Sequence, residues 1–98
     1  MAISNKVVFI AGGSTGIGLS IAVELAKNNN TLCLLARDIN KLEAAKATIE
    51  RSGNSKCYIY SADAVDYNVL KPVLENAVRE TGAPDLVINC VGLSLIHI

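Results

Sequence analysis

The sequence predicts an α/β fold in which helices cover a doubly wound, parallel sheet of about four strands. Short apolar runs alternate along the chain with longer segments whose apolar residues recur at helical spacing. The runs are continuous, as is typical of parallel strands buried on both faces. A repeated strand–helix order with short loops implies right-handed crossovers and one sheet with helices on both sides.

The first strand is predicted at residues 7–11, directly before a glycine-rich loop. Beyond the loop, Ile17, Ile21 and Leu25 are spaced four residues apart, which places them on one helix face that packs on the sheet. The asparagine run at residues 28–30 ends this helix, because asparagine tolerates the left-handed conformation at a helix C-terminus.

The second strand is predicted at residues 32–36, and Asp38 caps the helix that follows it. The inward face of this helix is apolar and carries Leu42, Ala45 and Ile49. Gly53 ends the helix, and the third strand covers residues 57–60.

The third helix ends at Gly82 and is followed by the fourth strand at residues 86–88. Its apolar residues recur at helical spacing: Val69, Val73 and Ala77. Pro72 is awkward within it, because proline removes a hydrogen bond and clashes one turn back. We therefore expect the helix either to start late, capped by Asn68, or to kink.

The glycine-rich loop has the spacing G-x-x-x-G-x-G at Gly12, Gly16 and Gly18, between a strand and a helix. Glycine allows backbone angles and a close approach of a ligand that a side chain would forbid. The first turn of a helix offers unpaired N–H groups at the positive end of its dipole, so a phosphate fits there. The alternative is a tight turn with a purely structural role. The strand–loop–helix context favours nucleotide binding.

In a sheet of this Rossmann type, ligands bind outside the carboxyl ends of the strands. The loop at residues 12–18, Arg37, Asp63 and Asn89 each follow or end a predicted strand. Four separate segments are therefore expected to meet at one edge of the sheet, which makes a stronger signal than any single motif.

The residues after the second strand favour NADP(H) over NAD(H). Asp38 lies about 20 residues past the glycines, where an acidic residue would bind the ribose hydroxyls of NAD. Arg37 comes first after the strand, however, and its guanidinium can grip a 2′-phosphate, with Lys41 one helical turn further on. Asp38 is better used as the helix cap. The alternative is that Arg37 and Lys41 are solvated surface cations.

Composition excludes several classes of protein. The formal net charge is zero and no basic run occurs, which argues against nucleic acid as a partner. No apolar run approaches the ~20 residues of a membrane-spanning helix, and the first residues do not form a secretory signal. The cysteines lie in apolar runs without metal-ligand spacing, so we expect core residues, a reducing cytoplasm and no metal site. They are Cys33, Cys57 and Cys90.

Together these residues resemble the N-terminal half of short-chain dehydrogenases/reductases. The resemblance covers residues 6–92 and rests on four segments: residues 11–18 (A-G-G-S-T-G-I-G), residues 36–38 (A-R-D), Asp63 and residues 89–92 (N-C-V-G). The family usually has threonine at the position of Ala11 and N-N-A-G at residues 89–92. Ala11 therefore lacks a hydroxyl that could tie the loop to the fourth strand.

The resemblance implies a cofactor-binding role for each of these segments. The loop would hold the pyrophosphate side of the cofactor through Gly12, Ser14, Thr15, Gly16, Ile17 and Gly18. Arg37 and Lys41 would take the 2′-phosphate, Asp63 the adenine edge, and Asn89 the region beside the nicotinamide ribose.

Within the family, the chain looks most like the 3-ketodihydrosphingosine reductases, which reduce the ketone of 3-ketosphinganine with NADPH. This resemblance rests on residues 35–38, 41–42, 66–67 and 89–90. It implies an oxidoreductase of sphingolipid metabolism with a lipid ketone substrate, a homo-oligomeric parent protein and a place at the cytosolic face of the endoplasmic reticulum. The alternatives are another carbonyl or 3-oxoacyl reductase, and a non-catalytic NADP-binding module. A methyltransferase is disfavoured, because its ligand has no 2′-phosphate for Arg37.

The family's chemistry needs a serine that orients the carbonyl, a tyrosine that donates a proton, and a lysine four residues later that lowers the pKa of the tyrosine. By resemblance these belong to the fifth strand and later helices, so we expect no catalytic residue in this chain and no activity from it alone. Tyr67 and Lys71 do satisfy Y-x-x-x-K. They precede the fourth strand, at the adenine end of the site, whereas hydride transfer occurs at the other end.

The last six residues, L-S-L-I-H-I, match one reading frame of the transposon mosaic end in common sequencing adaptors. We therefore expect residues 1–92 to be the N-terminal part of the cofactor-binding domain and residues 93–98 to be a non-native tail, and we give His97 no role. The alternative is an authentic short edge strand. A sheet of four strands would leave the flank of the fourth strand unpaired, so we expect poor solubility of the isolated chain.

Overall fold

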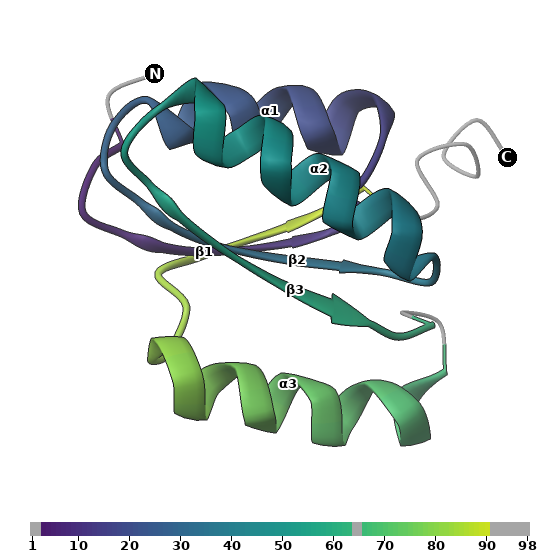
Figure 1. Ribbon diagram of the computed structural model, residues 1–98. Helices are drawn as coiled ribbons and strands as arrows, with labels where there is room; N and C mark the ends of the chain where they lie inside the picture. Colours follow the sequence, from purple (N-terminus) through teal and green to yellow (C-terminus); the bar gives the residue numbers. More distant parts are fainter. Residues whose placement is uncertain (1–2, 64–65, 91–98) are drawn as a thin grey trace, which may run out of the picture.

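The computed structural model describes residues 3–63 and 66–90, which form one parallel sheet with helices on both faces (Figure 1). The strands are β1 (Val7–Ala11), β2 (Thr31–Ala36), β3 (Lys56–Ser61) and β4 (Leu86–Asn89). The helices are α1 (Gly16–Ala26), α2 (Ile39–Ser52) and α3 (Tyr67–Thr81). Helices α1 and α2 cover one face of the sheet and α3 lies over the opposite face (Figure 1). The predicted fold class is confirmed.

The strand order is β3-β2-β1-β4, so the direction in which successive strands are added reverses at β1. All three pairs of neighbouring strands are parallel. At the carboxyl end of β1, Ala11 lies opposite Leu35 of β2 on one side and Asn89 of β4 on the other. The carboxyl ends of the strands therefore meet at one edge of the sheet, as the sequence predicts.

Most of the core lies between the sheet and the α1–α2 layer. The strands contribute Val8, Ile10, Leu32 and Leu34, and the helices contribute Ala22, Leu25, Leu42, Ala45 and Ile49. The predicted inward face of α2 is confirmed by these residues. The opposite face of the sheet has a smaller buried cluster under α3, formed by Phe9, Cys33 and Ala77.

Two of the three cysteines lie in this core, as expected. Cys33 and Cys57 are buried, whereas Cys90 is partly buried against the α1–α2 layer. Burial raises the pKa of the Cys57 thiol to about 12 and raises that of Cys33 as well. Both thiols therefore stay protonated and unreactive at neutral pH.

The predicted packing face of α1 is wrong at its first residue. Ile17 is 61% exposed, and the buried residues of the helix are Gly18, Ala22, Leu25 and Ala26. The reason is steric, because the first turn of α1 lies directly against the preceding loop. Only a residue without a side chain fits on that face, and this residue is Gly18.

The third helix, α3, does not start late at Asn68, which was one of the two alternatives expected for it. Its N-cap is Asp66, whose carboxylate accepts a hydrogen bond from the backbone N–H of Asn68 at 3.1 Å, so Asn68 is not the cap. Pro72 lies inside the helix. Of the predicted apolar face only Ala77 is buried, and Val69 is 45% exposed. The helix ends at Gly82 as predicted, with a left-handed φ of 92°.

Two expectations about the chain concern residues outside the described ranges. The domain boundary at residue 92 and the tail at residues 93–98 both lie there. Within the described ranges, none of the helices has the length and apolar composition needed to cross a bilayer.

Candidate functional site

The glycine-rich loop brings the first turn of α1 against the end of β1. Gly12 and Gly16 have left-handed φ angles of 79° and 59°, which favour glycine. The N–H of Gly12 donates to the carbonyl of Leu35 at 2.7 Å, which ties the loop to β2. A Cβ atom on Gly18 would lie 2.2 Å from the carbonyl oxygen of Gly12. The loop and the helix can therefore pack this closely only with glycine at position 18.

The three helices differ in how their first turns are capped. Asp38 caps α2 by accepting hydrogen bonds from the backbone N–H groups of Asn40 (2.9 Å) and Lys41 (3.3 Å), and Asp66 caps α3 in the same way. The N-cap of α1 is Thr15, whose side chain makes no capping hydrogen bond. Within the described residues, the positive end of α1 therefore has no side-chain cap at the loop where an anion is expected.

The structure brings the other predicted residues to the same edge of the sheet. Asn89 is the last residue of β4 and lies beside Ala11, while the N–H of Cys90 donates to the carbonyl of Ala11 at 2.8 Å. Asp63 follows the end of β3 by two residues and is partly exposed. Arg37 is the first residue after β2. Four chain segments thus surround the point at which the strand order reverses.

Arg37 and Lys41 are both exposed at this edge. In the part of the chain that the structure describes, neither side chain forms an ion pair, and the one ion pair found there joins Lys27 to Glu24 on α1. The carboxylate of Asp38 is turned toward the amides of α2. The prediction that Asp38 caps this helix is confirmed.

Tyr67 and Lys71, which satisfy Y-x-x-x-K, both lie on the exposed surface of α3. Tyr67 is the first residue of the helix and is 68% exposed. Within residues 3–63 and 66–90, no three His, Cys, Asp or Glu side chains are placed to hold a metal ion.

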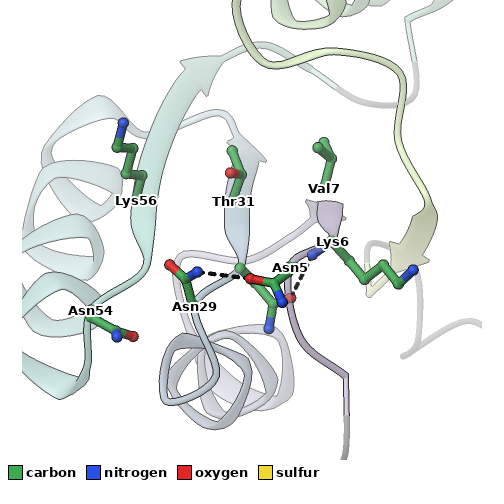
Figure 2. Close-up of a pocket in the computed structure, with 8 residues that line it drawn as sticks. Asn5, Lys6, Val7, Asn29, Thr31, Asn54 and Lys56 are labelled. Atoms are coloured by element: carbon green, nitrogen blue, oxygen red, sulfur yellow. Dashed lines mark hydrogen bonds between the residues drawn. The ribbon is translucent and has the colours of Figure 1, made fainter.

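A polar cluster that the sequence pattern does not reveal lies at the amino edge of the sheet, opposite the glycine loop. A hollow of about 310 Å³ is lined there by residues from the starts of β1, β2 and β3 (Figure 2). The side chain of Asn29 donates to that of Asn5, and the N–H of Lys6 donates to the side chain of Asn30. The side chains of Lys6 and Lys56 extend away from Asn5 and Asn29 (Figure 2).

A second contact that the sequence does not reveal is made by Ser61, whose hydroxyl donates to the backbone carbonyl of Arg37 at 2.9 Å. Nothing in residue spacing points to either contact, because each depends on which residues of neighbouring strands lie opposite one another.

The strand order, with a glycine-rich loop at the reversal, defines an α/β domain of the Rossmann type. Comparison with known families narrows this class. The chain belongs to the short chain dehydrogenase family, whose sequence model matches residues 6–97.

The chain is similar to curated 3-dehydrosphinganine and 3-ketodihydrosphingosine reductases. It is 39% identical over 92 residues to the 3-dehydrosphinganine reductase of Danio rerio, covering 90% of this chain and 28% of that protein. It is 37% identical over 99 residues to the 3-ketodihydrosphingosine reductase of Bos taurus, covering 97% of this chain and 30% of that protein. The resemblance to these reductases is confirmed. The chain spans less than a third of the length of either relative.

The fold is also similar to that of a solved sugar reductase. The crystal structure of L-sorbose reductase from Gluconobacter frateurii, complexed with NADPH and L-sorbose, matches with a TM-score of 0.81 at 30% identity. The match covers 89% of this chain and 33% of the sorbose reductase.

Proposed function

We propose that this chain is the cofactor-binding part of an NADPH-dependent reductase that converts a ketone to an alcohol. The observation that carries the proposal is that Asp38 caps α2 while the neighbouring Arg37 is exposed. The carboxylate of Asp38 accepts hydrogen bonds through Oδ1 from the amides of α2, so we assign it to the helix cap and not to the ribose hydroxyls of a cofactor. Arg37 and Lys41 are exposed beside it, which suits a 2′-phosphate.

The loop between β1 and α1 fits the pyrophosphate of such a cofactor. The N-cap side chain of α1 makes no capping hydrogen bond, and glycine stands at two left-handed positions there, Gly12 in the loop and Gly16 at the start of the helix. Gly18 keeps the helix close to Gly12, where any side chain would force them apart. In this proposal the backbone amides of residues 12–18 bind the phosphates, with Ser14, Thr15 and Ile17 lining the same loop.

NADPH would supply the hydride that reduces the carbonyl carbon. The residues of this chain hold and orient the cofactor. Asp63 would lie at the adenine edge and Asn89 beside the nicotinamide ribose, since β4 adjoins β1 at the strand reversal. We propose that the serine, tyrosine and lysine of the proton-transfer step come from sequence that follows β4, as the family resemblance implies.

The cofactor choice is tested by titrating NADPH and NADH into the protein expressed from its complete reading frame. We expect tighter binding of NADPH, and an increase of about ten- to hundredfold in its dissociation constant in Arg37→Ala, because a charge-assisted contact is lost. The binding of NADH should change little. Arg51→Ala, which removes an exposed arginine from the other end of α2, is the matched control. Equal affinities for the two cofactors in the unaltered protein would contradict the proposal.

For the substrate we propose 3-ketosphinganine, which would be reduced to sphinganine in sphingolipid biosynthesis. The support is the similarity to 3-dehydrosphinganine reductases over most of this chain. The test compares NADPH oxidation with 3-ketosphinganine and with a short-chain 3-oxoacyl thioester. Turnover of the thioester alone would point to another carbonyl reductase, and cofactor binding without turnover of either would point to a non-catalytic module.

We further propose that the whole protein is a homo-oligomer in the cytoplasm, at the cytosolic face of the endoplasmic reticulum where a lipid ketone would be met. Sedimentation of the complete protein and fractionation of its source cells test these two statements. A monomer would contradict the first, and an activity confined to the lumen would contradict the second.

A further inference from the structure

We infer that Ser61 is a positioning residue for the choice of cofactor, because it holds the backbone from which Arg37 extends. This inference rests on the proposed function, in which Arg37 binds the 2′-phosphate of NADPH. It concerns a residue at the end of β3, on a different strand from the arginine.

The chain leaves β2 through two consecutive carbonyl groups, and both are anchored to the end of β3. The N–H of Ala62 donates to the carbonyl of Ala36 at 2.9 Å, which continues the sheet ladder by one bond. The hydroxyl of Ser61 donates to the carbonyl of Arg37 at 2.9 Å. Ser61 can make this bond because it lies opposite Ala36 in the register of the two strands.

The far side of the same turn is also fixed. The N–H of Leu42 donates to the carbonyl of Asp38 at 3.0 Å, and the Asp38 side chain caps the first turn of α2. The backbone of Arg37 is therefore held between an anchored strand end and a capped helix, whereas its side chain is exposed to solvent. A long side chain loses less conformational freedom on binding a ligand when its base is already fixed.

Ser61 does not act as a phosphate ligand itself. A serine hydroxyl has one proton to donate, and that of Ser61 is directed at the carbonyl of Arg37. The oxygens of a phosphate are acceptors, so they need the donors of Arg37 and not the lone pairs of Ser61. The effect of Ser61 on the cofactor is thus transmitted through the arginine.

The test measures dissociation constants for NADPH and NADH with the protein from its complete reading frame. In Ser61→Ala, we expect the dissociation constant for NADPH to rise about three- to tenfold, because one hydrogen bond at the base of Arg37 is lost. Binding of NADH should change less than about twofold, and Ser61→Thr should restore the preference because it keeps the hydroxyl. Ser52→Ala is the matched control, since it removes a hydroxyl-to-carbonyl bond at the far end of α2.

A double-mutant cycle separates positioning from a general effect on the fold. In an Arg37→Ala background, Ser61→Ala should have no further effect on NADPH binding. The inference would be overturned if Ser61→Ala weakened the binding of NADPH and NADH equally. It would also be overturned if Ser61→Ala weakened NADPH binding just as much in the Arg37→Ala background. Should alanine prevent folding, Ser61→Val and Ser61→Thr make the same comparison, because they have the same shape and differ in the hydroxyl. If the unaltered protein shows no preference for NADPH, the proposed function fails, whereas a preference untouched by Ser61→Ala contradicts this inference alone.

Discussion

At the amino edge of the sheet, side-chain amides bind one another and the backbone, whereas at the carboxyl edge the chain exposes glycine, a helix end and two cations. The difference is clearest in two residues that follow α1 and β2. Asn30 is 2% exposed, and its side chain makes three hydrogen bonds, to Lys6, Ile3 and Leu25. Arg37 is exposed and makes no ion pair within the described residues.

This contrast indicates that the amino edge stabilises the fold through its own hydrogen bonds, whereas in our proposal the carboxyl edge binds a ligand. Asn5 and Asn29 hold left-handed conformations with φ angles of 57° and 54°, and they bind each other through backbone and side chain. The amino edge therefore satisfies its own polar groups. The carboxyl edge places helix dipole and positive charge where an anionic cofactor would complete it.

The largest expected effect is at the carboxyl edge, in Gly18→Ala. The new Cβ would lie 2.2 Å from the Gly12 carbonyl oxygen, so the helix must move. We expect a loss of about 3 kcal/mol or more in the free energy of unfolding, measured by urea denaturation, together with loss of NADPH binding. Gly16→Ala is the control, because its Cβ would meet no atom within 4 Å and only its φ of 59° is unfavourable, at about 1 kcal/mol. Similar losses in the free energy of unfolding in both variants would contradict the steric argument.

The next effect is at the amino edge, in Asn30→Ala. It removes three buried hydrogen bonds, so we expect a loss of about 2–3 kcal/mol in the free energy of unfolding. The affinity of the folded protein for NADPH should stay the same. Asn54→Ala changes an exposed asparagine beside the same hollow and should cost less than about 0.5 kcal/mol. A large change in cofactor affinity in Asn30→Ala would break the division between the two edges.

A smaller effect is expected from the cap of α2. Asp38→Ala should lower the free energy of unfolding by about 1 kcal/mol, while Asp38→Asn keeps an acceptor and should cost less. Neither variant should weaken the binding of NADPH, since the Asp38 carboxylate accepts hydrogen bonds from the helix amides. A loss of NADH binding in Asp38→Asn would instead show that the carboxylate contacts the ribose.

The smallest effect concerns Tyr60, one residue inside the carboxyl edge, whose hydroxyl donates to Glu80 of α3. Burial is the larger cause and the hydrogen bond to Glu80 the second cause of a pKa of Tyr60 that is raised above its ordinary value near 10. The folded state thus keeps the proton to higher pH than the unfolded state, so this stabilisation is complete below pH ~10 and declines as the pH rises further. Unfolding in urea at about pH 8 and about pH 11 should show a flatter pH dependence in Tyr60→Phe, which costs about 0.5 kcal/mol at the lower pH. An unchanged slope would exclude this role.

Much of the fold could be predicted because the strands are continuous apolar runs and the α2 face repeats at helical spacing. The edge at which the candidate site residues gather follows from the parallel order of the strands. The sequence alone therefore predicts that Arg37 and Asn89 lie at the same edge of the sheet. Ile17 was mispredicted, since helical spacing does not reveal that a preceding loop occupies part of a helix face. The glycine at position 18 is the feature of the sequence that indicates this close packing of the loop on the helix.

The contacts of Asn30 and Ser61 could not be predicted for a different reason. The bond between Lys6 and Asn30 and the bond between Ser61 and Arg37 each join residues 24 positions apart. Each of these two bonds depends on a register that a shift of one residue would abolish. The apolar pattern of a strand buried on both faces does not fix that register. The sequence therefore predicts the edge at which the candidate site residues gather, but not the hydrogen bond between Ser61 and Arg37.

Because the buried cluster beneath α3 is small, we expect the molecule to open first at this helix. Fewer buried side chains secure this helix than secure α1 or α2, so it can detach while the remaining layers stay intact. Its amide hydrogens should then exchange ahead of those of the other two helices. Cys33, whose thiol donates to Thr81 near the end of α3, would become accessible in the same event, so its rate of alkylation reports how often that layer separates.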